Sequence, residues 1–404
     1  MLGPGILVAA TGVGAGDLAT AAFAGSKLGV TVLWAVVLGA GIKYLLTEGL
    51  TRWQLATGET LLEGALSRLG RPVQYIFLIY LLLWSFMVAA ALMSACGVAA
   101  HAILPLVDVP ATGKIIYGII LSLLGVLLVR VGGYGLFEKV MSVCIGLMFV
   151  TVVVAAFVLA PGLSDILKGL VWPSIPDASG LAWTIALMGG VGGTVTVLCY
   201  GYWIREEGRF GSDSLRLCRI DLGVGYLMTA VFGLAMVVIG STIQVEGRGA
   251  TLVIRLAERL GEELGPVGRW AFLLGAFGAV FSSLLGVWQS VPYLFADLWG
   301  KIRSTGAATT AVSTKSAAYR WYLLGIALVP MIGLWVGFAR MQKSYAIVGA
   351  LFMPMLALVL LLLNGRTKWI GERYRNHPVI SAALVLILGF FLMAGGLSVQ
   401  RALG

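Results

Sequence analysis

The chain has 404 residues, of which 59% are hydrophobic and only 11% are charged. An ordinary soluble domain carries roughly a quarter charged residues, so this composition excludes a soluble enzyme and predicts an integral membrane protein whose partner is the lipid bilayer. The net charge of +10 is spread over the segments between apolar runs. We therefore expect no nucleic-acid partner.

The apolar runs predict an all-α polytopic fold. A spanning helix needs about 20 mostly apolar residues, and such runs follow one another too closely for a soluble domain to intervene. The whole chain, 1–404, is therefore predicted to be a single transmembrane transporter domain. In chain order we expect about eleven transmembrane helices, at residues 2–26, 29–51, 72–99, 113–131, 137–160, 180–204, 219–244, 267–298, 319–338, 344–364 and 378–399.

The basic residues predict the orientation. If the N-terminus is cytoplasmic, 18 of the 28 basic residues fall on the cytoplasmic side, with Lys43 of the second span included. This bias predicts a cytoplasmic N-terminus and an external C-terminus, in what we expect to be a bacterial inner membrane. Lys43 and Glu48 lie five residues apart in the second span, and we expect them to form a buried or interface-reaching pair.

Two glycine clusters indicate an internal repeat. GVGAGD (Gly12 to Asp17) lies in the middle of the first span and GGVGGTVT (Gly189 to Thr196) in the middle of the sixth. Each glycine costs about 1 kcal/mol in a helix interior relative to alanine. The clusters therefore either interrupt both helices or permit close helix packing. The helix-break glycines would be Gly12, Gly16, Gly190 and Gly192.

Their matching positions favour broken helices in an inverted-repeat transporter, where substrate binds near the midplane between two interrupted helices. Five spans would then form each repeat. The predicted limits are 1–160 for repeat one, 180–364 for repeat two and 378–399 for an extra helix.

Six motifs stand out along the chain: GPGILVAATGVGAGDLATAAFAGSKLG (Gly3 to Gly29), RWQLATGETLLE (Arg52 to Glu63), GLFEKV (Gly135 to Val140), LKGLVWPSIPD (Leu167 to Asp177), RID (Arg219 to Asp221) and FSSLLGVWQ (Phe281 to Gln289). Together they resemble the NRAMP family of divalent metal transporters. The resemblance implies a LeuT-like fold of five-plus-five inverted repeats with helices one and six broken. The resemblance covers nearly the whole chain.

The chain departs from the family at the metal site. Where the first helix of the family carries DPGN, this chain has GAGD, so that Gly14 replaces the metal-binding Asp and Asp17 stands at the Asn position. In the sixth helix the Ala and Met of the family correspond to Gly193 and Thr196, and its His is absent. A Gln of the tenth helix corresponds to Ala346. The acidic residues that couple the family to protons are absent from the third span, so we expect no proton coupling by that route.

The residues that remain predict a site for a hard cation. Carboxylate, hydroxyl and carbonyl oxygens suit Mg²⁺ or Mn²⁺, whereas the lost thioether suits softer metals. The expected ligands are the carboxylate of Asp17, the hydroxyl of Thr196 and the freed carbonyls of Gly14 and Gly193. Alternatively, Asp17 only caps the helix that restarts after the break.

The sequence thus predicts transport of a small divalent metal cation, Mg²⁺ or Mn²⁺, down its gradient. Two alternatives stay open: transport of a small organic, amino acid-like solute, and a non-transporting membrane sensor. The chain has no phosphate-binding loop, catalytic Ser/His/Asp set or HExxH motif, so we expect neither an enzymatic activity nor a cofactor.

Overall fold

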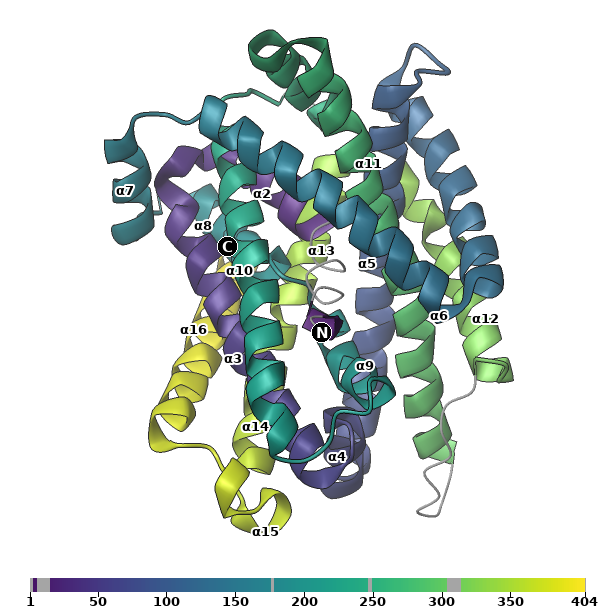
Figure 1. Ribbon diagram of the computed structural model, residues 1–404, viewed down its shortest axis with the longest axis vertical. Helices are drawn as coiled ribbons and strands as arrows, with labels where there is room; N and C mark the ends of the chain where they lie inside the picture. Colours follow the sequence, from purple (N-terminus) through teal and green to yellow (C-terminus); the bar gives the residue numbers. More distant parts are fainter. Residues whose placement is uncertain (1–2, 6–14, 176–177, 246–248, 304–313, 404) are drawn as a thin grey trace.

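The computed structural model describes residues 3–5, 15–175, 178–245, 249–303 and 314–403. Within these ranges the chain is almost entirely helical and contains no strand. Figure 1 shows an elongated bundle with helices along its long axis and short helices at both ends. The all-α architecture predicted from composition is therefore correct.

The first part of the bundle starts with a π-helical turn, Ala15–Thr20. The helices that follow are α2 (Ala21–Leu28), α3 (Leu33–Thr57), α4 (Leu61–Arg68), α5 (Arg71–Ile103), α6 (Pro110–Val158) and α7 (Leu163–Val171). The remaining helices are α8 (Ala178–Gly190), α9 (Cys199–Glu206), α10 (Asp213–Ser241), α11 (Leu252–Arg303), α12 (Ala317–Leu328), α13 (Phe338–Ala350), α14 (Phe352–Asn364), α15 (Thr367–Ile370) and α16 (Pro378–Leu403).

Eight stretches of the described chain are long and apolar enough to cross a membrane, or nine when the bent pair Phe149–Val158 and Leu163–Val171 counts as one. The sequence predicted about eleven. One stretch, Gly16–Thr57, has 42 residues and would be about 63 Å long as a straight helix, twice the ~30 Å hydrocarbon core. It contains two separate helices, α2 and α3 (Figure 1), which correspond to the first two predicted spans. The last predicted span corresponds to the shorter apolar helix Pro378–Ala394.

Two helices, α6 and α11, are much longer than any single predicted span. Figure 1 shows α6 descending on the right and returning diagonally across the molecule, so it contains the predicted fourth and fifth spans. Within α11 the helix breaks at Gly265, whose φ is 69°. The segment before this break has buried leucines and exposed ion pairs, including Arg259 with Glu262 at 2.9 Å. It is an amphipathic helix lying at one end of the bundle.

Helices far apart in the sequence pack together and frame the centre of the molecule. Helix α10 packs against α2 and α3, and α13 packs against α8. Helix α11 packs against α5 and α6, while α14 packs against α16. The segment that follows the first glycine cluster and the segment that contains the second are thereby brought to the middle of the bundle, where the candidate site lies.

The motif RWQLATGETLLE builds the turn after α3. Gly58 ends the helix with φ 73°, a conformation that favours glycine. Thr60 and Glu63 then form a reciprocal capping box at the start of α4. The Glu63 carboxylate also accepts a hydrogen bond of 2.7 Å from Arg205 of α9. This motif therefore attaches α4 to α9.

The motif RID attaches the N-terminal segment to the same end of the bundle. Asp221 is buried within α10, which begins at Asp213. Its Oδ2 accepts hydrogen bonds from the Gly5 backbone N–H at 2.9 Å, the Tyr200 hydroxyl at 3.0 Å and Arg209 at 3.1 Å. Asp221 is thus an anchor that joins three segments.

Candidate functional site

The sixth predicted span, which comprises α8 and α9 and is called helix six below, is interrupted at the second glycine cluster, as predicted. Helix α8 ends at Gly190, a 3₁₀ turn begins at Val195, and α9 follows (Figure 1). Gly192 and Gly193 have φ values of 75° and 80°, a region that costs an L-residue with a side chain roughly 1–2 kcal/mol. The two glycines therefore permit the interruption, which frees backbone N–H and C=O groups inside the bundle.

The first glycine cluster is described only in part. Gly12 and Gly14 lie outside the described residues, so the predicted carbonyl ligand of Gly14 has no structural description. From Ala15 the chain forms the π-helical turn and continues into α2. A π-helical turn is uncommon and is often found at functional sites.

The two clusters face each other in direct backbone contact. A Cβ atom placed on Gly16 would lie 2.2 Å from the carbonyl oxygen of Gly190. Van der Waals contact needs well over 3 Å, so no side chain fits between the two segments. Gly16 and Gly190, two of the predicted break glycines, therefore have a close-packing role. At the second cluster, helix interruption and close packing apply together.

The side chain of Asp17 also joins the two segments. Its carboxylate is fully buried, and Oδ1 accepts a hydrogen bond of 2.9 Å from the backbone N–H of Gly192. Asp17 lies in the first turn of the π-helical segment Ala15–Thr20, which continues directly into α2. Asp17 thus caps the interrupted backbone of helix six, and its second oxygen, Oδ2, is buried without a hydrogen-bond partner among the described residues.

Lys43 of α3 enters the interruption from another side. Its Nζ donates hydrogen bonds to three backbone carbonyls of helix six, those of Gly189 (2.7 Å), Val191 and Gly193. The side chain is 1% exposed. The carbonyl of Gly193, predicted to bind a cation, is therefore occupied by the ammonium group of the protein itself.

The predicted pair of Lys43 and Glu48 does not form. Glu48 binds Arg52 at 2.8 Å and Arg219 at 2.7 Å, while Lys43 is turned toward helix six. The two side chains, five residues apart on one helix, point about 140° away from each other around the axis. Lys43 also contributes nothing to the charge bias at the membrane surface, because it is buried.

Further polar and small residues surround the interruption. Thr196 is buried in the 3₁₀ turn that restarts helix six, and no hydrogen bond of the described residues joins it to Asp17. Tyr226 lies beside Gly192 and shares a hydrogen bond of 2.7 Å with Thr47. Ala346 of α13 lies against Gly189 and Gly190. No sequence pattern pointed to Tyr226, because an aromatic residue in an apolar span usually serves ordinary packing.

The arrangement offers oxygen ligands for a cation but no preassembled metal cluster. Within the part of the chain that the structure describes, no three His, Cys, Asp or Glu side chains gather as metal ligands. The ionisable side chains at the interruption, among the described residues, are those of Asp17 and Lys43. A divalent cation would therefore depend on Asp17 and on backbone oxygens.

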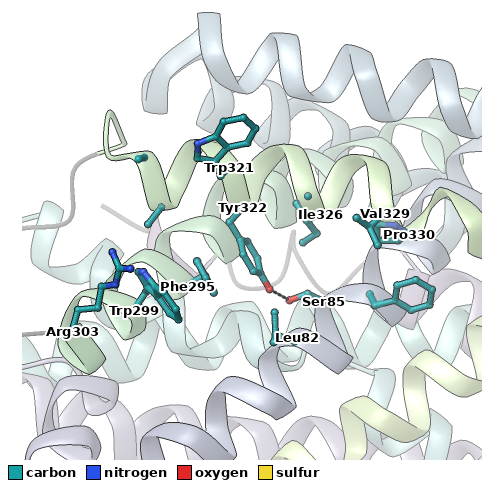
Figure 2. A pocket seen from close by; sticks show the side chains of 14 residues that line it. Leu82, Ser85, Phe295, Trp299, Arg303, Trp321, Tyr322, Ile326, Val329 and Pro330 are labelled. Atoms are coloured by element: carbon teal, nitrogen blue, oxygen red, sulfur yellow. Dashed lines mark hydrogen bonds between the residues drawn. The ribbon is translucent and has the colours of Figure 1, made fainter.

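One prominent groove lies away from this site. A groove of about 620 Å³ lies between α5, α11 and α12. Figure 2 shows the side chains that line it, among them the aromatic residues Trp299, Trp321 and Tyr322. Its one drawn hydrogen bond runs between the hydroxyls of Tyr322 and Ser85, at 2.8 Å. None of the predicted site residues lines it. With Trp321 exposed, this groove belongs to the outer surface of the bundle and not to the helix-six interruption.

Comparison with known proteins agrees with the motifs of the sequence. The family model described as natural resistance-associated macrophage protein-like matches residues 5–400. An uncharacterized protein of Pasteurella multocida is 26% identical over 291 residues, 68% of this chain and 64% of that protein. The divalent metal cation transporter MntH of Verminephrobacter eiseniae is 24% identical over 295 residues, 70% of this chain and 64% of that protein. The matches thus span less than two thirds of these relatives.

Solved structures show the same fold. The manganese transporter of Eremococcus coleocola, in complex with a bis-isothiourea compound, superposes with a TM-score of 0.73 at 16% identity, covering 97% of this chain and 84% of that one. MhsT in complex with L-phenylalanine superposes with a TM-score of 0.65 at 16% identity, covering 99% and 97%. The predicted LeuT-like fold with an inverted repeat is therefore confirmed.

Proposed function

Because the chain belongs to the Nramp family, whose model matches residues 5–400, we propose that it is a membrane transporter of divalent metal cations. Curated relatives include divalent metal cation transporters, and a solved structure of the same fold is a manganese transporter. The role is transport and not catalysis. It needs no cofactor, since the cation is the cargo.

We further propose that the cargo is a hard ion, Mg²⁺ or Mn²⁺. The observation that carries this proposal is the donor set at the interruption of helix six. Asp17 provides a carboxylate, Thr196 a hydroxyl and Gly193 a carbonyl, and the chain has neither a Met nor a His at the positions where the family has them in its sixth helix. Such all-oxygen sites suit hard cations, and Mg²⁺ usually keeps several waters beside one or two carboxylates. Gly14 would complete the set from the first helix.

Transport is proposed to run without proton coupling. The third span contains Ser94 and Cys96 but no carboxylate, and Val197, Leu198 and Cys199 stand where the family has a His in helix six. No side chain that titrates near neutral pH is therefore available at the family's positions. Cation entry is expected to follow its own gradient.

A second candidate cargo is a small organic solute. The observation that favours it is the position of Lys43, whose ammonium group already occupies the carbonyls of the interruption. MhsT, which has the same fold, was solved with bound L-phenylalanine. An ammonium and a carboxylate at one site can bind the opposite charges of an amino acid-like zwitterion.

Uptake into proteoliposomes tests these alternatives. Mg²⁺, Mn²⁺ and Ca²⁺ are compared with a small amino acid, for the wild type and Asp17→Ala, and a dye inside the vesicles reports pH. We expect uptake of Mg²⁺ or Mn²⁺ that Asp17→Ala abolishes, without internal acidification. Uptake of the amino acid alone would refute the cation proposal, and acidification during cation entry would refute only uncoupled transport.

We also propose the orientation and the repeat limits. The end of the bundle that carries α4, with Arg52, Arg68 and Arg205, would face the cytoplasm, since basic residues are retained there. The N-terminus would then be cytoplasmic and the C-terminus external, in a bacterial inner membrane. Repeat one would comprise 1–160, repeat two 180–364, and 378–399 would be an additional helix.

A further inference from the structure

We propose that Lys43 is a tethered cation, which holds the carbonyl oxygens of the helix-six interruption until an entering cation displaces it. This inference deepens the proposed function and rests on it for the identity of the cargo. Nothing in the family's metal-site motif includes a lysine of the second span.

The Lys43 ammonium group contacts carbonyl oxygens that could equally coordinate a bound metal cation. A lysine ammonium has three N–H donors, and the three carbonyls of Gly189, Val191 and Gly193 use all of them. These are carbonyls that the interruption leaves without helical partners. A ring of backbone carbonyls around a positive charge is the way in which proteins replace the hydration shell of an ion.

The carboxyl group of Asp17 contacts the same loop, residues 191–194. It binds the N–H of Gly192, which lies between two of the carbonyl groups that contact Lys43. A buried charge persists when a counter-charge and hydrogen bonds compensate it, and Lys43 has both. A divalent cation at these oxygens would meet a neighbouring ammonium of like charge, so the two cannot occupy the carbonyls together.

An alternative position for the ammonium exists within the site. The Oδ2 atom of Asp17 is buried and lacks a hydrogen-bond partner among the described residues. The lysine stem passes beside Gly192 and is flexible at each of its four methylene groups. Lys43 can therefore leave the carbonyls and remain compensated by Asp17 while the carbonyls bind a cation. The unpaired oxygen is also a free ligand atom for a positive charge at this place.

The test measures Mn²⁺ binding to the purified full-length protein by calorimetry and by cation-dependent thermal stabilisation. Lys43→Met keeps the side-chain volume but removes the competing charge. If Lys43 occupies the carbonyls in nine of ten molecules, its removal lowers the apparent Kd about tenfold. We expect at least this gain, and a larger Mn²⁺-induced rise in melting temperature than in the wild type.

Two further variants distinguish the effect of the Lys43 charge from a general effect of the substitution on the fold. Lys43→Arg retains the charge on a planar group and is expected to show no gain in Mn²⁺ binding. Lys27→Met removes the same charge from an exposed position of α2 and is expected to bind Mn²⁺ as the wild type does. If Lys43→Met is unstable alone but is recovered by Mn²⁺, the proposal is supported as well.

The outcomes distinguish this inference from the proposed function. Wild-type cation uptake together with unchanged or weaker binding by Lys43→Met would overturn the tethered cation and leave the transport proposal intact. Gained binding by Lys43→Met without wild-type uptake would support the tethered cation and refute cation transport. A Lys43→Met protein that is unstable with and without cations would overturn the inference, since Lys43 would then be a structural residue.

Discussion

Asp17 and Gly192 lie 175 residues apart in the sequence and are joined by a hydrogen bond of 2.9 Å, which the Gly192 N–H donates to the Asp17 carboxylate. This bond connects the segment after the first glycine cluster to the interruption of helix six. A buried backbone N–H without a partner is rare in proteins. The bond therefore gives Asp17 a structural role that is separate from any contact with cargo.

The two roles of Asp17 can be separated by two substitutions. Asp17→Asn keeps an oxygen that accepts the Gly192 N–H but removes the charge, so we expect a melting temperature near that of the wild type and cation uptake reduced at least about tenfold, as loss of a carboxylate ligand predicts. Asp17→Leu removes the acceptor as well and should cost about 1–3 kcal/mol in stability. Proteoliposome uptake and thermal unfolding in detergent measure both effects. Wild-type uptake by Asp17→Asn would show that the residue acts only as a cap.

A second prediction concerns the backbone contact between the two segments. A Cβ on Gly16 would overlap the carbonyl of Gly190 at 2.2 Å, and the obstacle is backbone that cannot rotate away. Gly16→Ala is therefore expected to destabilise the protein by about 1–3 kcal/mol, the usual cost of overpacking. Thermal unfolding of the purified protein measures this cost.

Gly41→Ala is the matched control for this contact. Gly41 also lies in a helix, and a Cβ there would meet nothing within 4 Å. The substitution should be neutral or stabilising by up to about 1 kcal/mol, because alanine favours helix more than glycine does. Equal melting temperatures for the two variants would mean that the segments do not approach each other as closely as described.

The sequence predicted the spans and the interruption of helix six because both depend on local features, namely the length of apolar runs and the clustering of Gly190, Gly192 and Gly193. It did not predict the partners of Asp17 and Lys43. The local alternatives were a cap for the next helix and a pair with Glu48, whereas the actual partners lie 146 to 175 residues away. Such partners depend on how α3, α8 and the first helix pack, which no local pattern encodes.

The last prediction concerns Glu63, which lies in α4 between two membrane spans. Burial opposes its ionisation, but the hydrogen bonds from Arg205 and from the Thr60 N–H outweigh this effect and hold the pKa of Glu63 below its ordinary value of 4.5. A carboxyl group with a lowered pKa in the folded state contributes stability that is fully present above 4.5. This contribution is lost as the pH falls through the lowered folded value.

Glu63→Gln removes that contribution, and hydrogen bonds to charged groups are worth about 1.5–3 kcal/mol. The melting temperature of the variant should therefore lie below that of the wild type by a constant amount from pH 8 to about pH 5. The difference should shrink at more acidic pH, where wild-type Glu63 becomes protonated. Glu258→Gln, at an exposed i,i+3 pair with Arg255 at 3.3 Å, is the control and should change stability by less than about 0.5 kcal/mol. If the difference in melting temperature between the wild type and Glu63→Gln widened below pH 5, the lowered pKa of Glu63 would be contradicted.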